Sequence, residues 1–124
     1  MSDIKIFVSD RIDVDSVQID NPIYVPVRCG AVFDSDNTSE IIGDDTGDNV
    51  SNRRLSFCEE TVLYWAWKNV KADYYGFCHY RRFLSFANKK FETSKINNHI
   101  IEEYLDNNSI KKYHLNDTES IHNI

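Results

Sequence analysis

A cationic cluster follows an aromatic segment near the middle of this chain. Tyr74–Cys78 leads directly into His79, Tyr80, Arg81 and Arg82. A guanidinium keeps its charge at physiological pH and can pair with two oxygens of an anionic group at once. An imidazole titrates near neutrality and can donate or accept a proton. These residue types predict a site for an anionic ligand.

A helix and a strand must position this cluster. Ser56 and Glu59 have the Ser-x-x-Glu spacing of a capping box, which predicts a helix that begins near Phe57. Its buried stripe is expected to contain Cys58, Val62, Trp65, Ala66 and Asn69. The aromatic run Tyr74–Cys78 then predicts a short buried strand. The cluster would lie at the carboxyl end of that strand, where open α/β sheets bind their ligands.

The remaining segments complete an α/β pattern. Ile4–Val8 and Pro22–Cys29 are expected to be strands, and Pro26 favours an edge or bulged position for the second because proline donates no ladder hydrogen bond. Asp34–Asn52 has the composition of a long loop. A helix ending at Asn107-Asn108 is predicted from the apolar residues Ile96, Ile100, Ile101, Tyr104 and Leu105. Residues 111–124 have no assignable pattern.

The length and composition of the chain exclude several classes of function. At 124 residues, with 41% hydrophobic residues, the chain is expected to form a single domain over residues 1–124. Its net charge of -6 and pI near 5.1 argue against a protein that coats nucleic acid. No run of about 18 apolar residues occurs, so no membrane span or signal peptide is expected. Cys29, Cys58 and Cys78 lack zinc-site spacing and are interpreted as reduced, buried thiols of a cytoplasmic protein.

Three motifs carry a resemblance to a known family. They are Asp44-Asp45-Thr46-Gly47-Asp48-Asn49-Val50-Ser51, the segment Phe57–Asn69, and Gly76-Phe77-Cys78-His79-Tyr80-Arg81-Arg82-Phe83. With Ile4–Val8 and Ile23–Ala31, they resemble the bacterial capsular and exopolysaccharide glycosyltransferases that carry domain of unknown function 4422. The resemblance covers the N-terminal half of the family's domain, so the chain is interpreted as a partial member whose C-terminal half is absent.

The resemblance implies a GT-A-like, Rossmann-type sheet that binds a nucleotide sugar. The implied function is transfer of a sugar from a nucleotide-diphosphate donor to a surface polysaccharide. The alternatives are a catalytically incomplete nucleotide-sugar-binding module and an assembly subunit. GT-A enzymes commonly carry an Asp-x-Asp metal motif where this chain has Cys78–Arg82. Magnesium and manganese prefer carboxylate oxygens, which this segment lacks, so Arg81 and Arg82 are expected to neutralise the diphosphate instead.

Within this interpretation, individual residues receive candidate roles. Asp48 and His79 are the candidate catalytic residues, and the nucleotide-sugar ligands are Asp44, Asp45, Asn49, Glu60, His79, Tyr80, Arg81 and Arg82. The aspartates could orient ribose hydroxyls, take a proton from the acceptor or bind a metal, whereas Asp48 and Asn49 could equally cap a helix or shape the turn at Gly47. Glu60 could lie on a solvated helix face, and Tyr80 could simply pack. Each arginine could equally be ion-paired at the strand exit.

No cofactor is assigned, and no metal ligands are proposed. A divalent metal ion remains an option for the diphosphate, although Asp13-Val-Asp15 and Asp34-Ser-Asp36 do not follow convincing buried strands. The expected partners are a nucleotide-diphosphate sugar and a polysaccharide or lipid-linked acceptor, with no nucleic acid. The expected location is the cytoplasm, at the inner face of the membrane through peripheral association, because activated donors are cytoplasmic.

Overall fold

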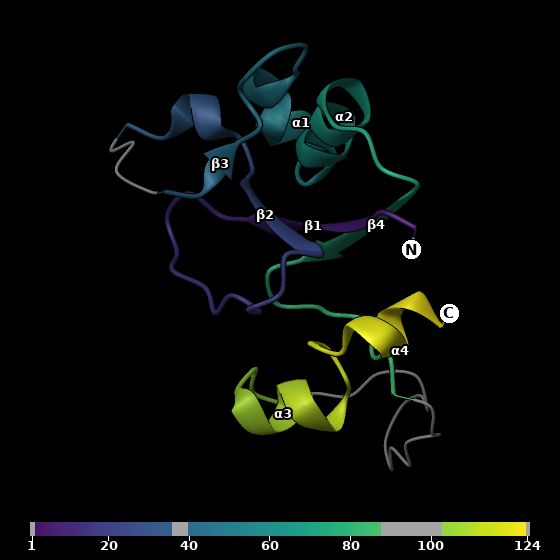
Figure 1. The fold of residues 1–124 in the computed structure, drawn as a ribbon. Helices are drawn as coiled ribbons and strands as arrows, with labels where there is room; N and C mark the ends of the chain where they lie inside the picture. The colour runs from purple at the N-terminus through teal and green to yellow at the C-terminus, as the bar shows by residue number, and fades with distance from the viewer. Residues whose placement is uncertain (1, 36–39, 88–102, 124) are drawn as a thin grey trace. The chain divides into compact units, whose positions relative to one another are not determined.

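Four strands in the first part of the chain form one parallel sheet. The computed structural model describes residues 2–35, 40–87 and 103–123. The strands are β1 (Ile4–Asp10), β2 (Tyr24–Arg28), β3 (Ile42–Gly43) and β4 (Tyr74–His79), in the order β3-β2-β1-β4. β1 lies between β2 and β4 and runs parallel to both (Figure 1). The α/β prediction is confirmed, and β1 extends two residues beyond the predicted strand.

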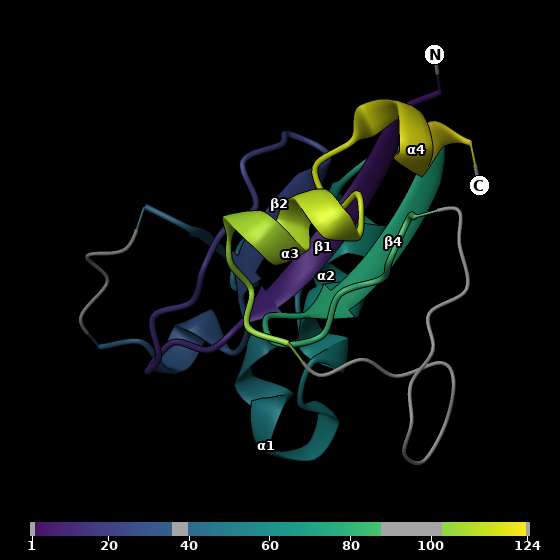
Figure 2. The same cartoon turned by 90° about the horizontal axis from the view of Figure 1, so that it is seen from below.

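The order of the strands creates a switch point in the sheet. The chain passes from β1 outward to β2 and β3, and then returns to the other side of β1 as β4. Figure 2 shows β1 in purple beside β4 in green. Their register pairs Ser9 with His79 near the carboxyl ends of both strands. Open α/β sheets bind ligands beyond the strand ends at such a reversal, so the topology favours the edge that carries the cationic cluster.

Two helices cover one face of this sheet (Figure 1). They are α1 (Arg54–Phe57) and α2 (Glu60–Asn69), preceded by the short 3-10 helices η1 (Ala31–Phe33) and η2 (Ser51–Arg53). The predicted capping box is wrong, because Ser56 lies inside α1 and no side chain caps α2 at Glu59. Cys58 adopts a φ of 50°, which ends α1 and leaves Ser56 and Glu59 in separate elements.

The core lies between α2 and the sheet. Val62, Trp65 and Ala66 are buried on α2 and belong to one apolar cluster with Phe7 and Val27. The Trp65 ring meets the Phe7 ring edge-on, with centroids 6.4 Å apart. Burying a large apolar side chain contributes about 1.5–3 kcal/mol, so these contacts fix α2 on the sheet. The centre of the predicted stripe is confirmed, whereas its two ends, Cys58 and Asn69, are exposed.

Two predictions about strand environment are wrong. β4 was expected to be buried, but Tyr74, Tyr75 and Phe77 are 63%, 40% and 36% exposed. The reason is that β4 is the outermost strand of the described sheet. β2 was expected to be at an edge or bulged because of Pro26, yet it lies between β1 and β3. β3 pairs only with Val27 and Arg28, so Pro26 has no ladder partner on that side in the described sheet.

The polar segment before the helices contains more structure than its composition predicts. Residues 34–52 include β3, which extends the sheet by a two-residue pairing with β2. Gly47 adopts a φ of +58°, which glycine reaches without steric cost. The chain therefore turns at Gly47, as the polar, glycine-containing motif indicated.

Residues Leu84–Ile124 form a second compact unit. It contains α3 (Asn107–Lys112) and α4 (Thr118–His122). The predicted helix stop at Asn107-Asn108 is wrong, because Asp106 caps α3 by accepting the Ser109 N–H at 2.9 Å. Tyr104 lies outside any helix, while Ile96, Ile100, Ile101 and Asp36 lie outside the described residues. α4 falls in the tail for which the sequence showed no pattern.

No helix in the described ranges has the length and apolar character needed to cross a membrane. All three cysteines are free thiols. Cys29 is buried as expected, and Cys78 is half-buried. Cys58 is exposed, so the prediction of burial is wrong for this residue, because it occupies the turn between α1 and α2.

Candidate functional site

The cationic cluster forms a tight turn at the carboxyl end of β4. The Arg82 N–H donates to the His79 carbonyl at 2.8 Å and closes the turn. The Tyr80 N–H donates to the Ser9 carbonyl at 3.1 Å, which docks the turn against the end of β1. The backbone therefore holds the cluster at the switch point between the two strands.

Arg81 and Arg82 are exposed on this turn. Within the part of the chain that the structure describes, neither forms an ion pair. The Arg81 guanidinium carbon lies 5.1 Å from the centroid of the Tyr80 ring, which is itself buried. A cation over an aromatic face is held in place without losing its charge. Both guanidinium groups are thus able to bind an anion.

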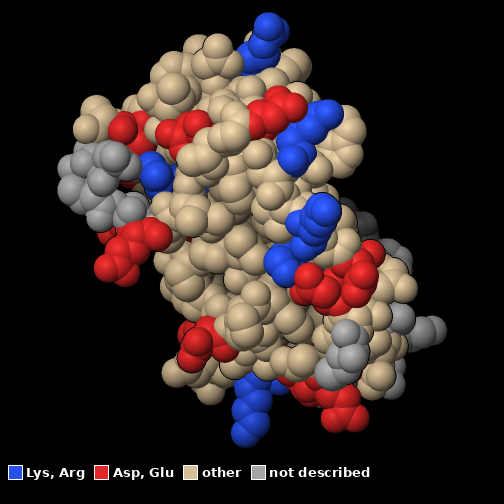
Figure 3. Space-filling view, turned by 45° about the horizontal axis from the view of Figure 1, so that its top comes forward, with Lys and Arg blue, Asp and Glu red and all other residues tan. Residues whose placement is uncertain are grey.

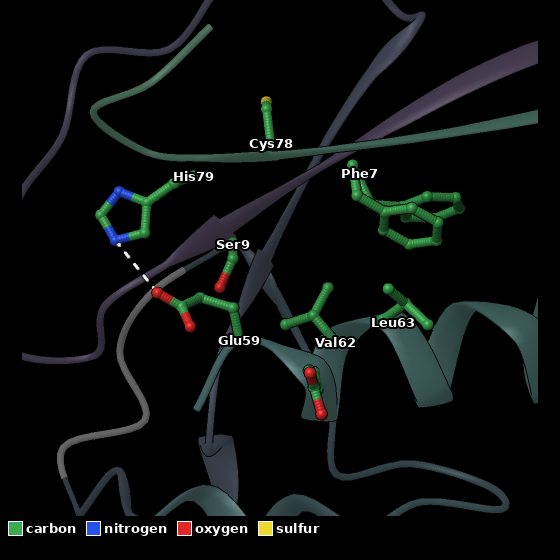
Figure 4. A pocket seen from close by; sticks show the side chains of 9 residues that line it. Phe7, Ser9, Glu59, Val62, Leu63, Cys78 and His79 are labelled. Carbon is green, nitrogen blue, oxygen red and sulfur yellow. Dashed lines mark ion pairs between the residues drawn. The ribbon is translucent and has the colours of Figure 1, made fainter. Parts of the chain in front are cut away.

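His79 is held at both ring nitrogens. Its Nδ1 accepts the Arg81 N–H at 3.2 Å, and its Nε2 lies 3.5 Å from the Glu59 Oε1 (Figure 4). Because Nδ1 acts as an acceptor, the proton of the neutral ring belongs on Nε2, facing Glu59. The His79 side chain is 15% exposed and that of Glu59 is 53% exposed. Sequence reasoning missed Glu59 because its spacing from Ser56 indicated a capping role.

The pKa of His79 is expected to lie below its ordinary value of 6.5, because burial of the ring disfavours the charged form. Glu59 opposes this shift, while Arg81, Arg82 and Arg11 add to it. The neutral ring therefore predominates at pH 7. Since the unfolded chain binds the proton more readily, this group's contribution to stability is present above pH 6.5 and is lost as the pH falls toward the folded pKa.

An NMR titration of the His79 ring protons tests this electrostatic balance. Wild-type protein should give a pKa below 6.5, and Glu59→Gln should lower it further because the opposing carboxylate is removed. Arg82→Ala should raise the pKa toward the ordinary value. A pKa above 6.5 in the wild-type protein would contradict the arrangement around the ring.

A small hollow lies between α2 and the ends of β1 and β4. Its volume is about 230 Å³, and Figure 4 shows His79, Glu59 and Ser9 at one end, with Phe7 and Leu63 at the other. Glu60 also lines it. The hollow is smaller than the roughly 300–1,000 Å³ of sites for drug-sized ligands, so it fits only one part of a larger ligand.

Cys78 borders this hollow but does not provide a nucleophile there. Figure 4 shows its side chain on the opposite side of the strand from α2. Burial raises the pKa of the Cys78 thiol to about 12, with a further contribution from the Asp10 carboxylate. A thiol with such a pKa is protonated at neutral pH and is a poor nucleophile.

A second hollow lies beyond the carboxyl ends of β1 and β2, with a volume of about 270 Å³. Most of its lining residues are polar or charged, among them Asp10, Arg11, Ser16, Gln18 and Arg28. The buried Asp10 accepts hydrogen bonds from Ser16 Oγ at 3.1 Å and Gln18 Nε2 at 3.0 Å. Burial raises the pKa of Asp10 although both hydrogen bonds act to lower it.

Asp44 lies inside the protein and not at a ligand surface. It is 0% exposed and accepts four hydrogen bonds. The donors are the backbone N–H groups of Gly30 and Ala31, at 3.0 Å each, and the hydroxyls of Ser51 and Thr61, at 2.6 and 2.5 Å. Both carboxylate oxygens are thus occupied by the protein. Asp44 joins η1, η2 and α2 at one point.

Asp48 is held by residues of α2, whereas Asn49 bonds within its own loop. Tyr64 donates to the Asp48 carboxylate at 2.9 Å, and Asn69 Nδ2 donates to the Asp48 carbonyl at 2.8 Å. Asn49 bonds locally, accepting the Ser51 N–H at 3.2 Å. Glu59 precedes α2 and Asn69 ends it, so about 15 Å of helix axis separates them at 1.5 Å per residue. The structure therefore does not bring Asp48 and His79 together.

The other predicted ligands lie nearer the strand ends. Asp45 is the second residue after β3 and is exposed. Glu60 is exposed at the first hollow, and Tyr80 is buried beneath the cationic turn. Arg11, which follows β1, was not predicted, although its place directly after a predicted strand is the same signal that identified the cluster after β4.

Charge on the surface is mixed. On the face in Figure 3, Lys and Arg side chains alternate with acidic and uncharged residues, and no continuous basic stripe runs across it. Among residues 2–35, 40–87 and 103–123, no group of three or more His, Cys, Asp or Glu side chains is placed to hold a metal ion.

Comparison with known proteins agrees with the family resemblance that the three motifs indicated. Residues 5–121 match the model of the family described as Domain of unknown function (DUF4422). A solved structure titled as the apo structure of WbbM, a bifunctional glycosyltransferase, is similar with a TM-score of 0.81 and 35% sequence identity. The similarity covers 98% of this chain and 21% of that chain, so this chain spans about a fifth of its length. Comparison with curated proteins finds no match. The match over residues 5–121 establishes that the chain belongs to the DUF4422 family.

Proposed function

We propose that this protein binds a nucleotide-diphosphate sugar and transfers the sugar as a glycosyltransferase. The observation that carries the proposal is the pair of exposed arginines, Arg81 and Arg82, at the switch point of the sheet without an acidic partner in the described chain. A diphosphate offers anionic oxygens on two phosphoryl groups, and each guanidinium can pair with two such oxygens. The 35% identity to a chain titled as a glycosyltransferase supports the same conclusion.

The two hollows and the turn between them match the three parts of such a donor. The polar hollow beside Asp10 and Gln18 offers hydrogen-bonding groups for the nucleoside. The turn at Arg81 and Arg82 would bind the diphosphate. The hollow beside Glu59 and His79 would receive the sugar. Each hollow is smaller than a site for a drug-sized ligand, so we assign only one part of the donor to each.

The same hollow contains a group for proton transfer. Glu59 is half-exposed there and is held by the His79 ring at 3.5 Å. A carboxylate in this position can accept a proton from an incoming hydroxyl as the diphosphate leaves. His79, with its proton on Nε2, would position Glu59 and would not itself act as the base. We therefore assign the base to Glu59, and Asp48 has no part in the proposed site.

The proposal also covers the acceptor, the type of fold and the place of the reaction. A surface polysaccharide or a lipid-linked precursor is the acceptor class, and a GT-A-type arrangement is the class of fold. Nucleotide sugars are cytoplasmic, so the reaction would take place in the cytoplasm at the inner face of the membrane, by peripheral association. The described residues would supply the donor-binding site and the proton acceptor.

Titration calorimetry with a panel of nucleotide sugars, together with a sugar-transfer assay, tests this function. Binding of at least one nucleotide sugar with turnover is the expected result. Glu59→Gln should retain donor binding and lose turnover, because only the proton acceptor is removed. Absence of binding by every nucleotide sugar in the panel would overturn the proposal.

A second candidate is an assembly subunit. The aromatic side chains of β4 are exposed along the outermost strand of the described sheet. Such a strand can pair with another polypeptide through its free edge. Nucleotide-sugar binding without turnover, combined with a mass that rises with protein concentration, would favour this candidate or a binding module.

A further inference from the structure

Arg11 follows the carboxyl end of β1, the strand that pairs with β4 and ends beside the cationic turn. The register pairs Ser9 with His79, and the Tyr80 N–H continues the ladder by donating to the Ser9 carbonyl at 3.1 Å. Arg11 lies two residues after Ser9, and Arg81 lies two residues after His79 in the turn that the Arg82 N–H closes on the His79 carbonyl. The fold thus places a third guanidinium at the same edge of the sheet as the other two.

Electrostatics agrees with this placement. Burial is the main cause of the lowered pKa of His79, and Arg81, Arg82 and Arg11 each lower it further, as expected of positive charges at the same edge of the sheet. Arg11 also interacts with the side chain of Tyr80, the residue that supports Arg81. Three guanidinium groups at one edge of the sheet repel one another. An anion bound among them offsets this electrostatic repulsion.

Arg11 already has an anionic partner in the free protein. Its guanidinium makes two bonds to the Asp13 carboxylate, Nε to Oδ1 at 2.8 Å and Nη2 to Oδ2 at 2.5 Å. The two side chains are 45% and 55% exposed. Ion pairs exposed to this degree contribute little to stability, so an incoming ligand can replace Asp13 at small cost. The paired geometry is also the one in which a guanidinium binds two phosphate oxygens.

We propose that Arg11 is a third diphosphate-binding residue and that Asp13 occupies its guanidinium until the diphosphate arrives. On binding, Arg11 exchanges the two Asp13 oxygens for two phosphate oxygens, and the Asp13 carboxylate turns to solvent. Asp13 then acts as a competing anion that lowers the affinity of the empty site. This inference rests on the proposed function, because it assigns the ligand of the same site.

Inorganic pyrophosphate is the probe that tests the proposal separately from sugar transfer. Arg11→Ala should weaken pyrophosphate binding to the whole chain about 10-fold, as expected when a charge-assisted hydrogen bond is lost. Asp13→Asn keeps the shape of the side chain, removes the competing charge and should strengthen binding about 3-fold. Circular dichroism melting curves verify that both variants are folded.

Lys5→Ala is the matched control. Lys5 is also a cation paired with a nearby carboxylate, that of Asp3 at 2.8 Å, but it lies near the opposite end of β1. This variant should bind pyrophosphate as the wild-type protein does. Unchanged binding by folded Arg11→Ala overturns the proposal, and weaker or unchanged binding by Asp13→Asn overturns the role of Asp13. Pyrophosphate binding without any nucleotide-sugar binding would overturn the proposed function while leaving Arg11 in place.

Discussion

Replacing Arg81 or Arg82 by alanine is expected to weaken binding of a nucleoside diphosphate about 10- to 100-fold. A hydrogen bond to a charged group contributes about 1.5–3 kcal/mol, and about 1.4 kcal/mol corresponds to a tenfold change in affinity. Both side chains are exposed on the turn, so their removal should leave the fold intact. Titration calorimetry with the nucleoside diphosphate and with the free nucleoside measures the effect.

The free nucleoside provides the internal control. Its affinity should stay constant in both variants, because it lacks the group that the arginines bind. Arg81→Lys should give an intermediate loss, since lysine retains the charge but not the planar pair of donors. Addition of a chelator should leave diphosphate binding unchanged. Equal losses for nucleoside and diphosphate would indicate misfolding, and strict dependence on manganese would overturn the role of the arginines.

The second large effect is expected for stability and not for binding. Asp44→Ala should lower the free energy of unfolding by about 3–4 kcal/mol. The substitution leaves the N–H groups of Gly30 and Ala31 buried without an acceptor, and each such group costs about 1–3 kcal/mol. The hydroxyls of Ser51 and Thr61 lose the same acceptor. Urea unfolding followed by circular dichroism gives the difference.

Asp45→Ala is the control for this prediction. Asp45 is the same residue type at the adjacent position, but it is exposed, so its replacement should change stability by less than about 0.5 kcal/mol. The hydrogen bonds of Asp44 also depend on Gly30. Gly30 has a φ of +65° and donates its N–H to the Asp44 carboxylate. A stable Asp44→Ala variant that has lost ligand binding would contradict the structural role and restore Asp44 as a ligand.

The elements that depend on local pattern were predictable. The buried stripe of α2 follows from helical spacing, and β1 and β4 follow from runs of β-branched and aromatic residues. Capping and boundaries were less predictable, since Ser56 and Glu59 have the right spacing but the turn at Cys58 separates them. The burial of β4 was overestimated because an aromatic run indicates a strand without indicating its place in the sheet.

Some residues of the candidate site could likewise be identified from the sequence, whereas the roles of others could not. Residue type and position after a strand singled out His79, Arg81 and Arg82, because a guanidinium after a parallel strand is placed at the sheet edge whatever surrounds it. The same reasoning could not separate Asp44 from Asp45. A carboxylate that organises the interior and one that faces solvent look alike until the donors around them are known.

By itself, the sequence determined the α/β class, the family and the cationic end of β4, since these depend on the order and chemistry of neighbouring residues. Only the tertiary structure decided which side chains meet. It brought Arg11 and Glu59 to the cluster from other elements, and it placed Asp48 at the far end of α2. Contacts between residues distant in the chain depend on strand order and register, which no local pattern encodes.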